Sequence, residues 1–144
     1  MKVKKYDYLS EDAKNIRASV FIQEQGFERE FDAVDDVACQ IVMYEDDNQP
    51  IATCRVFEDS QQNQFVLGRL AVMKDYRGKN IGSKMLQEAE NIVLKEGGTS
   101  IILHAQCRVK EFYERMGYVA FGEIEEDEGC PHIWMKKELN SVER

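Results

Sequence analysis

One stretch of the chain decides its fold: Arg69-Leu-Ala-Val-Met-Lys-Asp-Tyr-Arg77-Gly-Lys-Asn-Ile-Gly82-Ser-Lys-Met-Leu86. The pattern predicts an apolar strand, a short polar loop and an amphipathic helix that begins near Asn80. A helix start leaves backbone N–H groups without partners and carries about half a positive charge, and glycines let the backbone approach a ligand. With Arg77 and Lys79 adding full charges, the junction predicts a phosphate site, although such residues also occur in ordinary loops.

Composition sets the class of protein. The chain has 144 residues, of which 43% are hydrophobic and 32% charged, so we expect one globular domain over residues 1–144. No apolar run approaches the roughly 18 residues of a membrane helix, and the first residues lack a signal peptide's apolar segment, which predicts a cytoplasmic protein without a membrane partner. The net charge of −8 argues against nucleic acid as the main partner. Four widely spaced cysteines and two histidines predict reduced thiols and no metal site.

Strand and helix patterns alternate in an order that predicts an α/β fold with a mixed sheet. Strands are expected over residues 3–8, 39–45, 51–58, 65–72, 100–105, 119–124 and 132–138. Helices are expected from Asn80, from Val109 and after Ser10, which we expect to cap the first helix. In that first helix Ala13, Ile16, Val20 and Phe21 share one face. An acidic loop is expected over residues 125–129. The strand at 100–105 follows a helix and is expected to run parallel to the strand at 65–72.

An acidic, irregular segment covers residues 28–37. A solvated loop or short helix accounts for it, and a lid that attracts a cationic substrate is the functional alternative.

Several short motifs, in chain order, carry a resemblance to a known family. In the loop, the family pattern falls on Arg77, Asn80 and Gly82. The other matching groups are Ala105-Gln106, Phe112-Tyr113, Gly117-Tyr118, Arg17-x-x-Val20-Phe21-x-x-Glu24-Gln25, Glu30-x-Asp32-x-x-Asp35 and Gly129-x-Pro131-His132-x-x-Met135. Over essentially its full length the chain resembles the GNAT superfamily of N-acetyltransferases and, within it, the ElaA-like subgroup.

The resemblance implies the GNAT acyl-CoA N-acyltransferase fold. In that fold a central, mostly antiparallel sheet splays at its parallel pair and is flanked by helices, and acetyl-CoA is the co-substrate. The residues that the resemblance assigns to acetyl-CoA are Leu70, Ala71, Val72, Arg77, Gly78, Lys79, Asn80, Ile81, Gly82, Ser83, Gln106, Phe112 and Tyr113. Asn80 replaces a usual glycine, and we expect it to keep the loop because asparagine tolerates left-handed backbone.

The implied reaction is direct attack of a primary amine on the acetyl-CoA thioester in a ternary complex. Tyr113 matches the family's tyrosine acid, with a ring in the core or against CoA as the alternative. Gly68 stands where many relatives carry a carboxylate base, which leaves Glu24, Asp35 and His132 as candidates that act through water. The alternatives are a structural hydrogen bond for His132 and a cap or an ion pair, such as one with Arg17, for Glu24.

The acceptor is inferred from charge alone. The residues expected to bind a cationic amine, such as an amino acid, a polyamine or a lysine side chain, are Glu24, Gln25, Glu30, Asp32 and Asp35. Acidic residues also keep a protein soluble, so this preference needs no substrate. Two other classes stay open: a non-catalytic acyl-CoA-binding module and a phosphate-binding enzyme unrelated to acyl transfer. The apolar strands near the C-terminus also leave a homodimer open.

Overall fold

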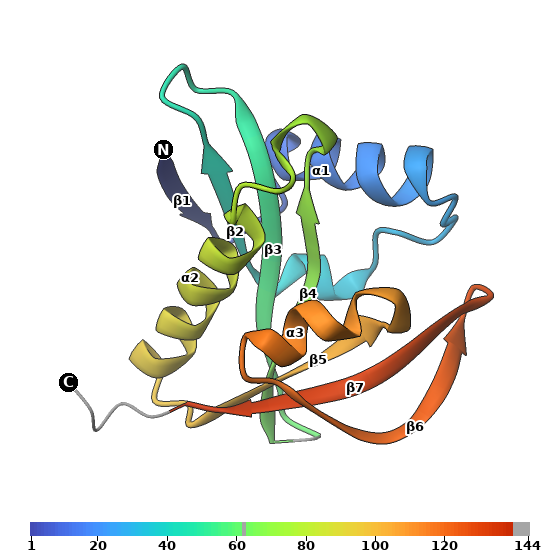
Figure 1. The fold of residues 1–144 in the computed structure, drawn as a ribbon. Coiled ribbons are helices and arrows are strands. Elements are labelled where there is room, and N and C mark those ends of the chain that lie inside the picture. Colours follow the sequence, from blue (N-terminus) through green and yellow to red (C-terminus); the bar gives the residue numbers. More distant parts are fainter. Residues whose placement is uncertain (62, 140–144) are drawn as a thin grey trace. The chain divides into compact units, whose positions relative to one another are not determined.

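The computed structural model describes residues 1–61 and 63–139, which form a mixed sheet and its surrounding helices (Figure 1). The strands are β1 (Lys2–Tyr6), β2 (Cys39–Tyr44), β3 (Pro50–Asp59), β4 (Gln64–Val72), β5 (Ser100–Gln106), β6 (Val119–Asp127) and β7 (Cys130–Glu138). Their order in the sheet is β1-β2-β3-β4-β5-β7-β6. The α-helices are α1 (Glu11–Arg17), α2 (Ile81–Lys95) and α3 (Lys110–Arg115), the π-helix is η1 (Ala18–Glu24), and the 3-10 helices are η2 (Ala33–Asp36), η3 (Lys74–Tyr76) and η4 (Cys107–Val109). The predicted α/β fold with a mixed sheet is confirmed.

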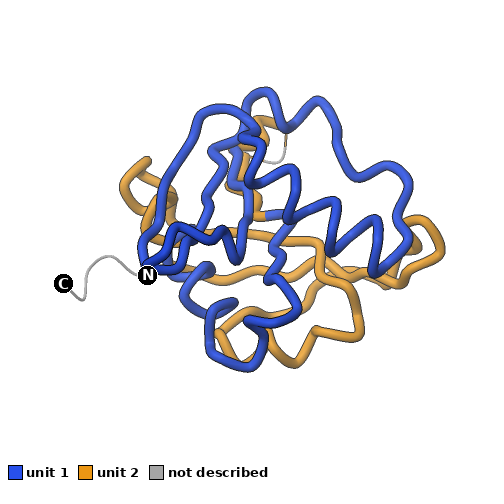
Figure 2. Tube along the Cα trace, turned by 90° about the horizontal axis from the view of Figure 1, so that it is seen from above, with its two compact units in different colours: residues 1–57, 68–89 blue, residues 58–67, 90–144 orange. Residues whose placement is uncertain are grey.

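The described chain divides into two compact units, each built from separate segments (Figure 2). Unit 1 holds residues 1–57 and 68–89. Unit 2 holds residues 58–67 and the described residues from 90 onward. The assignment of residues 1–144 to a single domain stays a prediction.

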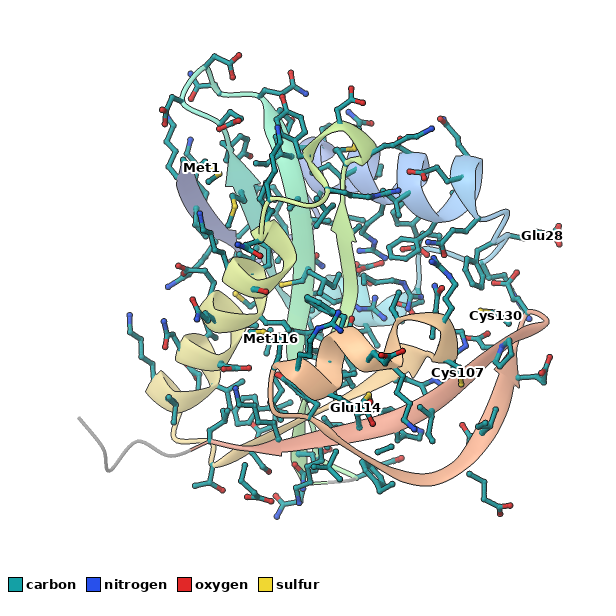
Figure 3. The ribbon with its side chains drawn as sticks, viewed as in Figure 1. Met1, Glu28, Cys107, Glu114, Met116 and Cys130 are labelled. Atoms are coloured by element: carbon teal, nitrogen blue, oxygen red, sulfur yellow. The ribbon has the colours of Figure 1, made fainter. Side chains whose placement is uncertain are left out.

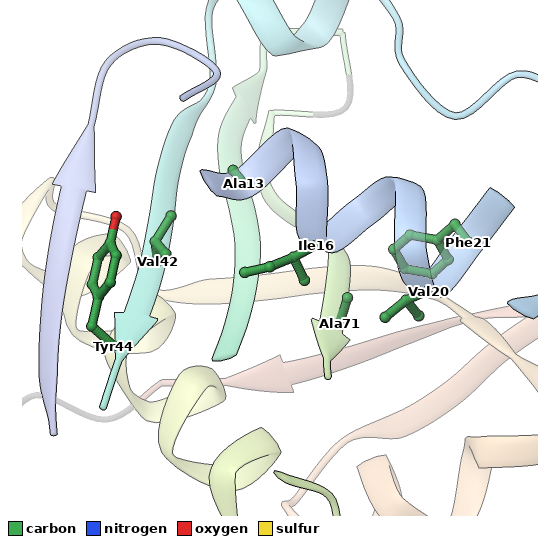
Figure 4. Packing of buried hydrophobic residues seen from close by; sticks show 7 residues of the cluster. All are labelled: Ala13, Ile16, Val20, Phe21, Val42, Tyr44 and Ala71. Atoms are coloured by element: carbon green, nitrogen blue, oxygen red, sulfur yellow. The ribbon is translucent and has the colours of Figure 1, made fainter. Parts of the chain in front are cut away.

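In unit 1, an amphipathic helix covers an antiparallel ladder. Strand β2 pairs antiparallel with both β1 and β3. The apolar face of α1 and η1 packs on side chains of β2 and β4 in a buried cluster (Figure 4). Its members are Ala13, Ile16, Val20, Phe21, Val42, Tyr44 and Ala71. The predicted cap is confirmed as well, since the Ser10 hydroxyl oxygen accepts a hydrogen bond from the Ala13 N–H at 3.2 Å.

In unit 2, the parallel pair lies where the sequence predicts it. Residues 65–67 of β4 pair in parallel with residues 101–103 of β5, and β7 pairs antiparallel with both β5 and β6. The expected acidic loop at 125–129 is wrong, because Glu125 to Asp127 pair with His132 to Cys130 and extend the β6–β7 hairpin. Only Glu128 and Gly129 form the turn, both with positive φ, as in the tight turns that match strand twist. An edge strand tolerates charge on its exposed side, so the acidic residues did not mark a loop.

Element boundaries differ modestly from expectation. β1 ends at Tyr6 rather than at residue 8, and α3 begins at Lys110 because residues 107–109 form the tighter η4.

Among the described residues, no helix combines the length and hydropathy that crossing a bilayer would require. The four cysteines are free, including Cys107 and Cys130 in unit 2 (Figure 3). Within residues 1–61 and 63–139, no group of acidic, histidine or cysteine side chains is arranged to hold a metal ion.

Candidate functional site

The loop between β4 and α2 has the backbone expected of an anion site. Gly78 and Asn80 both adopt left-handed conformations, with φ of 78° and 62°, so Asn80 has the backbone conformation expected of it, and its contact with CoA stays a prediction. Helix α2 begins at Ile81, and the Lys84 N–H bonds to the Asn80 carbonyl at 3.2 Å. The N–H groups at the start of such a helix lack carbonyl partners within it and favour an anion. Residues 77–80 are exposed, so an anion can reach the loop from solvent.

Arg77 in this loop has two protein partners. Its Nη1 and Nη2 donate to the two carboxylate oxygens of Glu24 at 3.0 and 2.8 Å, and its Nε donates to the Val72 carbonyl at 2.9 Å. Arg77 thus ties the end of η1 to the end of β4. The ion pair considered for Glu24 is present, and its partner in this pair is Arg77. Lys79 adds another cationic side chain to this loop, and its Nζ lies 5.6 Å from the centre of the Tyr76 ring.

The acidic segment is folded onto arginines and does not simply face solvent. Arg17, which is fully buried, donates from Nε to Glu30 Oε2 at 2.9 Å and from Nη1 to Asp35 Oδ1 at 2.6 Å. Arg55 Nη1 donates to the same Asp35 oxygen at 2.9 Å. The short helix η2 confirms one alternative for this segment, but Glu30 and Asp35 are only 4% exposed. Their arginine partners account for both carboxylates, and contact with a cationic acceptor stays a prediction.

Three further arginine–carboxylate pairs extend these contacts along β3 and β4. Arg55 donates to both carboxylate oxygens of Asp32, at 2.6 and 3.1 Å. Arg69 lies with Nε 3.0 Å from Glu30 Oε2 and Nη2 3.4 Å from Asp32 Oδ2. We refer to Arg17, Glu30, Asp32, Asp35, Arg55 and Arg69 as the arginine–carboxylate cluster.

Burial and the arginines act in opposite directions on the cluster's carboxyl groups. Burial raises the pKa of Glu30, although Arg69 and Arg17 oppose the shift. Burial also acts to raise the pKa of Asp35, but hydrogen bonds from Arg17, the Asp32 N–H and Arg55, together with the charge of Arg17, outweigh it. The pKa of Asp35 therefore lies well below its usual range.

Acid should destabilise the protein through Asp35. Because its pKa is lowered in the folded state, the stability it contributes is present above its unfolded pKa of about 4 and is lost as pH falls toward the folded value. We expect Asp35→Asn to flatten the decline of the unfolding free energy below pH 4, measured by urea denaturation at several pH values. Asp36→Asn, at the exposed next residue, is the matched control and should keep the wild-type profile. Equal profiles for the two variants would show that Asp35 has no such role.

The proposed acid, Tyr113, lies on α3 in unit 2. It is 9% exposed, and its ring makes edge-to-face contacts with Phe112 and Tyr118, with ring centres 5.1 and 5.9 Å apart. Gln106, at the end of β5, accepts a hydrogen bond from Arg108 Nε at 3.0 Å. The contacts with Phe112 and Tyr118 hold the Tyr113 ring in place, and the role of Tyr113 as acid stays a prediction.

His132 belongs to an aromatic stack on β5 and β7. Its Nδ1 lies 2.8 Å from the Cys130 carbonyl, which can only accept, so the neutral ring carries its proton on Nδ1 and Nε2 is the basic nitrogen. Its ring centre lies 4.9 Å from that of His104, which stacks in turn on Trp134 at 4.6 Å. Burial and the neighbouring His132 lower the pKa of His104. The hydrogen bond with the Cys130 carbonyl provides the structural role considered for His132, and its role as base stays a prediction.

Comparison with known proteins settles the family. The family described as acetyltransferase (GNAT) domain matches residues 6–139. The chain belongs to the GNAT acetyltransferase family. This GNAT chain is 32% identical to YyaT of Bacillus subtilis over 133 residues, which cover 90% of this chain and 88% of YyaT. The family's enzymes are acetyl-CoA-dependent N-acyltransferases, which confirms the predicted enzyme class.

Two solved structures bear on the fold and the subgroup. ElaA of Escherichia coli is 26% identical over 129 residues, covering 86% of this chain and 84% of ElaA. Its crystal structure matches this GNAT chain with a TM-score of 0.81 at 22% identity and covers 96% of this chain and 100% of that one. An aminoglycoside 6'-N-acetyltransferase in complex with coenzyme A has a TM-score of 0.72 at 16% identity, covers 96% and 97% of the two chains, and shares the fold. The predicted GNAT fold and the ElaA-like resemblance are confirmed.

Proposed function

We propose that this protein transfers an acetyl group from acetyl-CoA to a primary amine of a small molecule or a lysine side chain, by direct attack in a ternary complex. The observation that carries the proposal is the left-handed backbone of Gly78 and Asn80 at the start of α2, in a chain of the GNAT family. A loop of this geometry suits the pyrophosphate of CoA, because backbone N–H groups and the helix dipole both favour an anion.

Each unit would supply its own part of the machinery. In unit 1, the backbone of residues 77–83 and the Lys79 ammonium group would hold the pyrophosphate, and the backbone of residues 70–72 would pair with the pantetheine arm. The N–H of Ala71 or Val72 would donate to the developing oxyanion. Acetyl-CoA, when bound, supplies the thioester. In unit 2, Gln106 and Phe112 would contact CoA, and the Tyr113 hydroxyl would give its proton to the departing thiolate.

The amine must lose a proton before or during attack. Glu24 and His132 are the proposed bases, each acting through water. Both oxygens of Glu24 accept hydrogen bonds from Arg77, so Glu24 is less well supported as the base. His132 is better supported, since its Nδ1 contact fixes the tautomer and makes Nε2 the nitrogen that takes up a proton.

The acceptor class follows from charge. The net charge of −8 and the acidic segment support a cationic amine, and Glu24, Gln25, Glu30, Asp32 and Asp35 remain the proposed contacts. Among them, the Asp32 side chain is 40% exposed and the Glu24 side chain 34% exposed, whereas Glu30 and Asp35 are buried. Direct contact is therefore better supported for Asp32 and Glu24.

Structural features also support two alternatives that the sequence leaves open, an acyl-CoA-binding module and a homodimer. Gly68 in place of a strand carboxylate, together with the Glu24–Arg77 pair, favours a non-catalytic acyl-CoA-binding module. A homodimer through β6 is supported by its place at the end of the strand order and by the exposure of Val119 and Ile124, at 69% and 62%. We propose no nucleic-acid partner.

Substitution of Asn80 tests the phosphate loop. Asn80→Val should weaken CoA binding about tenfold, because a β-branched side chain disfavours positive φ by roughly 1–2 kcal/mol, whereas Asn80→Gly should keep the wild-type affinity. Calorimetric titration with CoA and with ATP measures both variants and also distinguishes an unrelated nucleotide-binding enzyme. Wild-type affinity in Asn80→Val, or equal binding of ATP and CoA by the wild type, would contradict the assignment of this loop to CoA.

A further inference from the structure

Arg69 has a backbone conformation that its residue type disfavours. It lies inside β4 with a φ of 55°, although it is a bulky side chain in a strand and neither glycine nor asparagine. A left-handed conformation at such a residue persists only when the surrounding structure enforces it. The next three residues are the ones assigned above to the pantetheine arm and the oxyanion.

The Arg69 guanidinium group is anchored at several points by the acidic segment. Its Nε donates to the Glu30 carbonyl at 3.1 Å and lies 3.0 Å from Glu30 Oε2, and its Nη2 lies 3.4 Å from Asp32 Oδ2. Its side chain is 27% exposed, and the Glu30 side chain is 4% exposed. The strained residue is thus held through its own side chain by a buried partner.

Each carboxylate that holds Arg69 is itself held by a second arginine. Glu30 accepts from the buried Arg17 Nε at 2.9 Å, and Asp32 accepts from both Nη1 and Nη2 of Arg55 at 2.6 and 3.1 Å. Arg17 comes from α1 and Arg55 from β3, so the anchor is fixed to two elements of unit 1. Both carboxylates that contact Arg69 are therefore held by side chains from other elements of unit 1.

We propose that Arg69 is a positioning residue for acyl transfer. The arginine–carboxylate cluster holds the left-handed backbone at Arg69 and so sets the orientation of residues 70–72, from which the N–H of Ala71 or Val72 would face the developing oxyanion. The inference rests on the proposed function. The role of Arg69 is geometric, because its guanidinium group acts through the backbone and does not touch the reacting atoms. A misplacement of about 1 Å at a catalytic group can cost on the order of a hundredfold in rate, so this orientation matters.

Two substitutions at one position separate the backbone effect from the charge. Arg69→Ala removes the anchor and disfavours positive φ, whereas Arg69→Gly removes the same anchor and adopts positive φ freely. We expect Arg69→Ala to lower kcat about 10- to 100-fold with little change in KM for the amine, and Arg69→Gly to retain at least threefold more activity than Arg69→Ala. Equal losses in the two variants, or wild-type kcat in Arg69→Ala, would overturn the proposal.

A measurement without turnover keeps the inference separate from the function. The backbone chemical shifts of residues 70–72, recorded by NMR, should move more in Arg69→Ala than in Arg69→Gly. Asp32→Asn, which leaves the Glu30 contact in place, provides a milder variant should Arg69→Ala fail to fold, and it should shift the same resonances. If the wild type released no thiol from acetyl-CoA, the proposed function would fail, and these shifts would still test the anchor. Unchanged shifts in both Asp32→Asn and Arg69→Ala would overturn the proposal that the cluster holds the backbone at Arg69.

Discussion

Replacing Arg17 with alanine is expected to lower the free energy of unfolding by about 3–5 kcal/mol, because it leaves two buried carboxylates without their shared cation. Arg17 is fully buried, while Glu30 and Asp35 are each 4% exposed. Its guanidinium group also lies 4.8 Å from the centre of the Phe31 ring, so the change removes packing as well as charge. Urea denaturation at pH 7 measures the effect.

The matched control lies on the same helix. Lys14→Ala removes an exposed cation from α1 and should change the free energy of unfolding by no more than about 0.5 kcal/mol. A loss below 1 kcal/mol in Arg17→Ala would show that the cluster contributes little to stability. That result would also weaken its assignment as the anchor of Arg69.

Tyr113→Phe is expected to lower kcat by about 10²- to 10⁴-fold with the affinity for acetyl-CoA nearly kept. The substitution keeps the ring and its contacts with Phe112 and Tyr118, and removes only the hydroxyl that would protonate the leaving thiolate. Steady-state kinetics at saturating amine, together with a CoA titration, separates a loss of turnover from a loss of binding.

Tyr118→Phe is the control for a lost hydroxyl in the same unit. The Tyr118 hydroxyl donates to Glu90 Oε2 at 2.9 Å and has no proposed part in the reaction. Its loss should cost about 1–2 kcal/mol of stability and leave kcat within twofold of the wild type. If Tyr113→Phe also kept its turnover number at saturating substrates, Tyr113 would not be the acid.

Local patterns predicted most of the fold. The apolar spacing of residues 13, 16, 20 and 21 gave the buried face of α1 and η1, and the strand that follows α2 gave the parallel partner of β4. Both rest on periodicity and chain order, which a single sequence contains. The loop at Gly78 and Asn80 was predictable for another local reason, since the residue types able to adopt positive φ are few.

Charge pairing was not predictable in this way. Glu24 and Arg77 lie 53 positions apart, and Arg69 lies 39 positions from Glu30, so no local spacing identifies either pair. One signal was present: Arg17 falls four residues after Ala13 and three before Val20, on the buried face of the helix. A buried arginine requires acidic partners, and the acidic segment nearby held them. The segment does form the expected short helix η2, but Glu30 and Asp35 are buried against arginines and do not face solvent.

The measurement that tests the central claim most directly is release of free thiol from acetyl-CoA in the presence of amino acids, polyamines, aminoglycosides and lysine peptides, alongside a CoA binding titration. We predict CoA binding and amine-dependent thiol release with at least one class of amine, cationic amines first. Tight CoA binding without turnover on any amine would contradict catalysis and support the acyl-CoA-binding module. Failure to bind CoA would contradict the assignment of the Arg77–Gly82 loop and the proposed function with it.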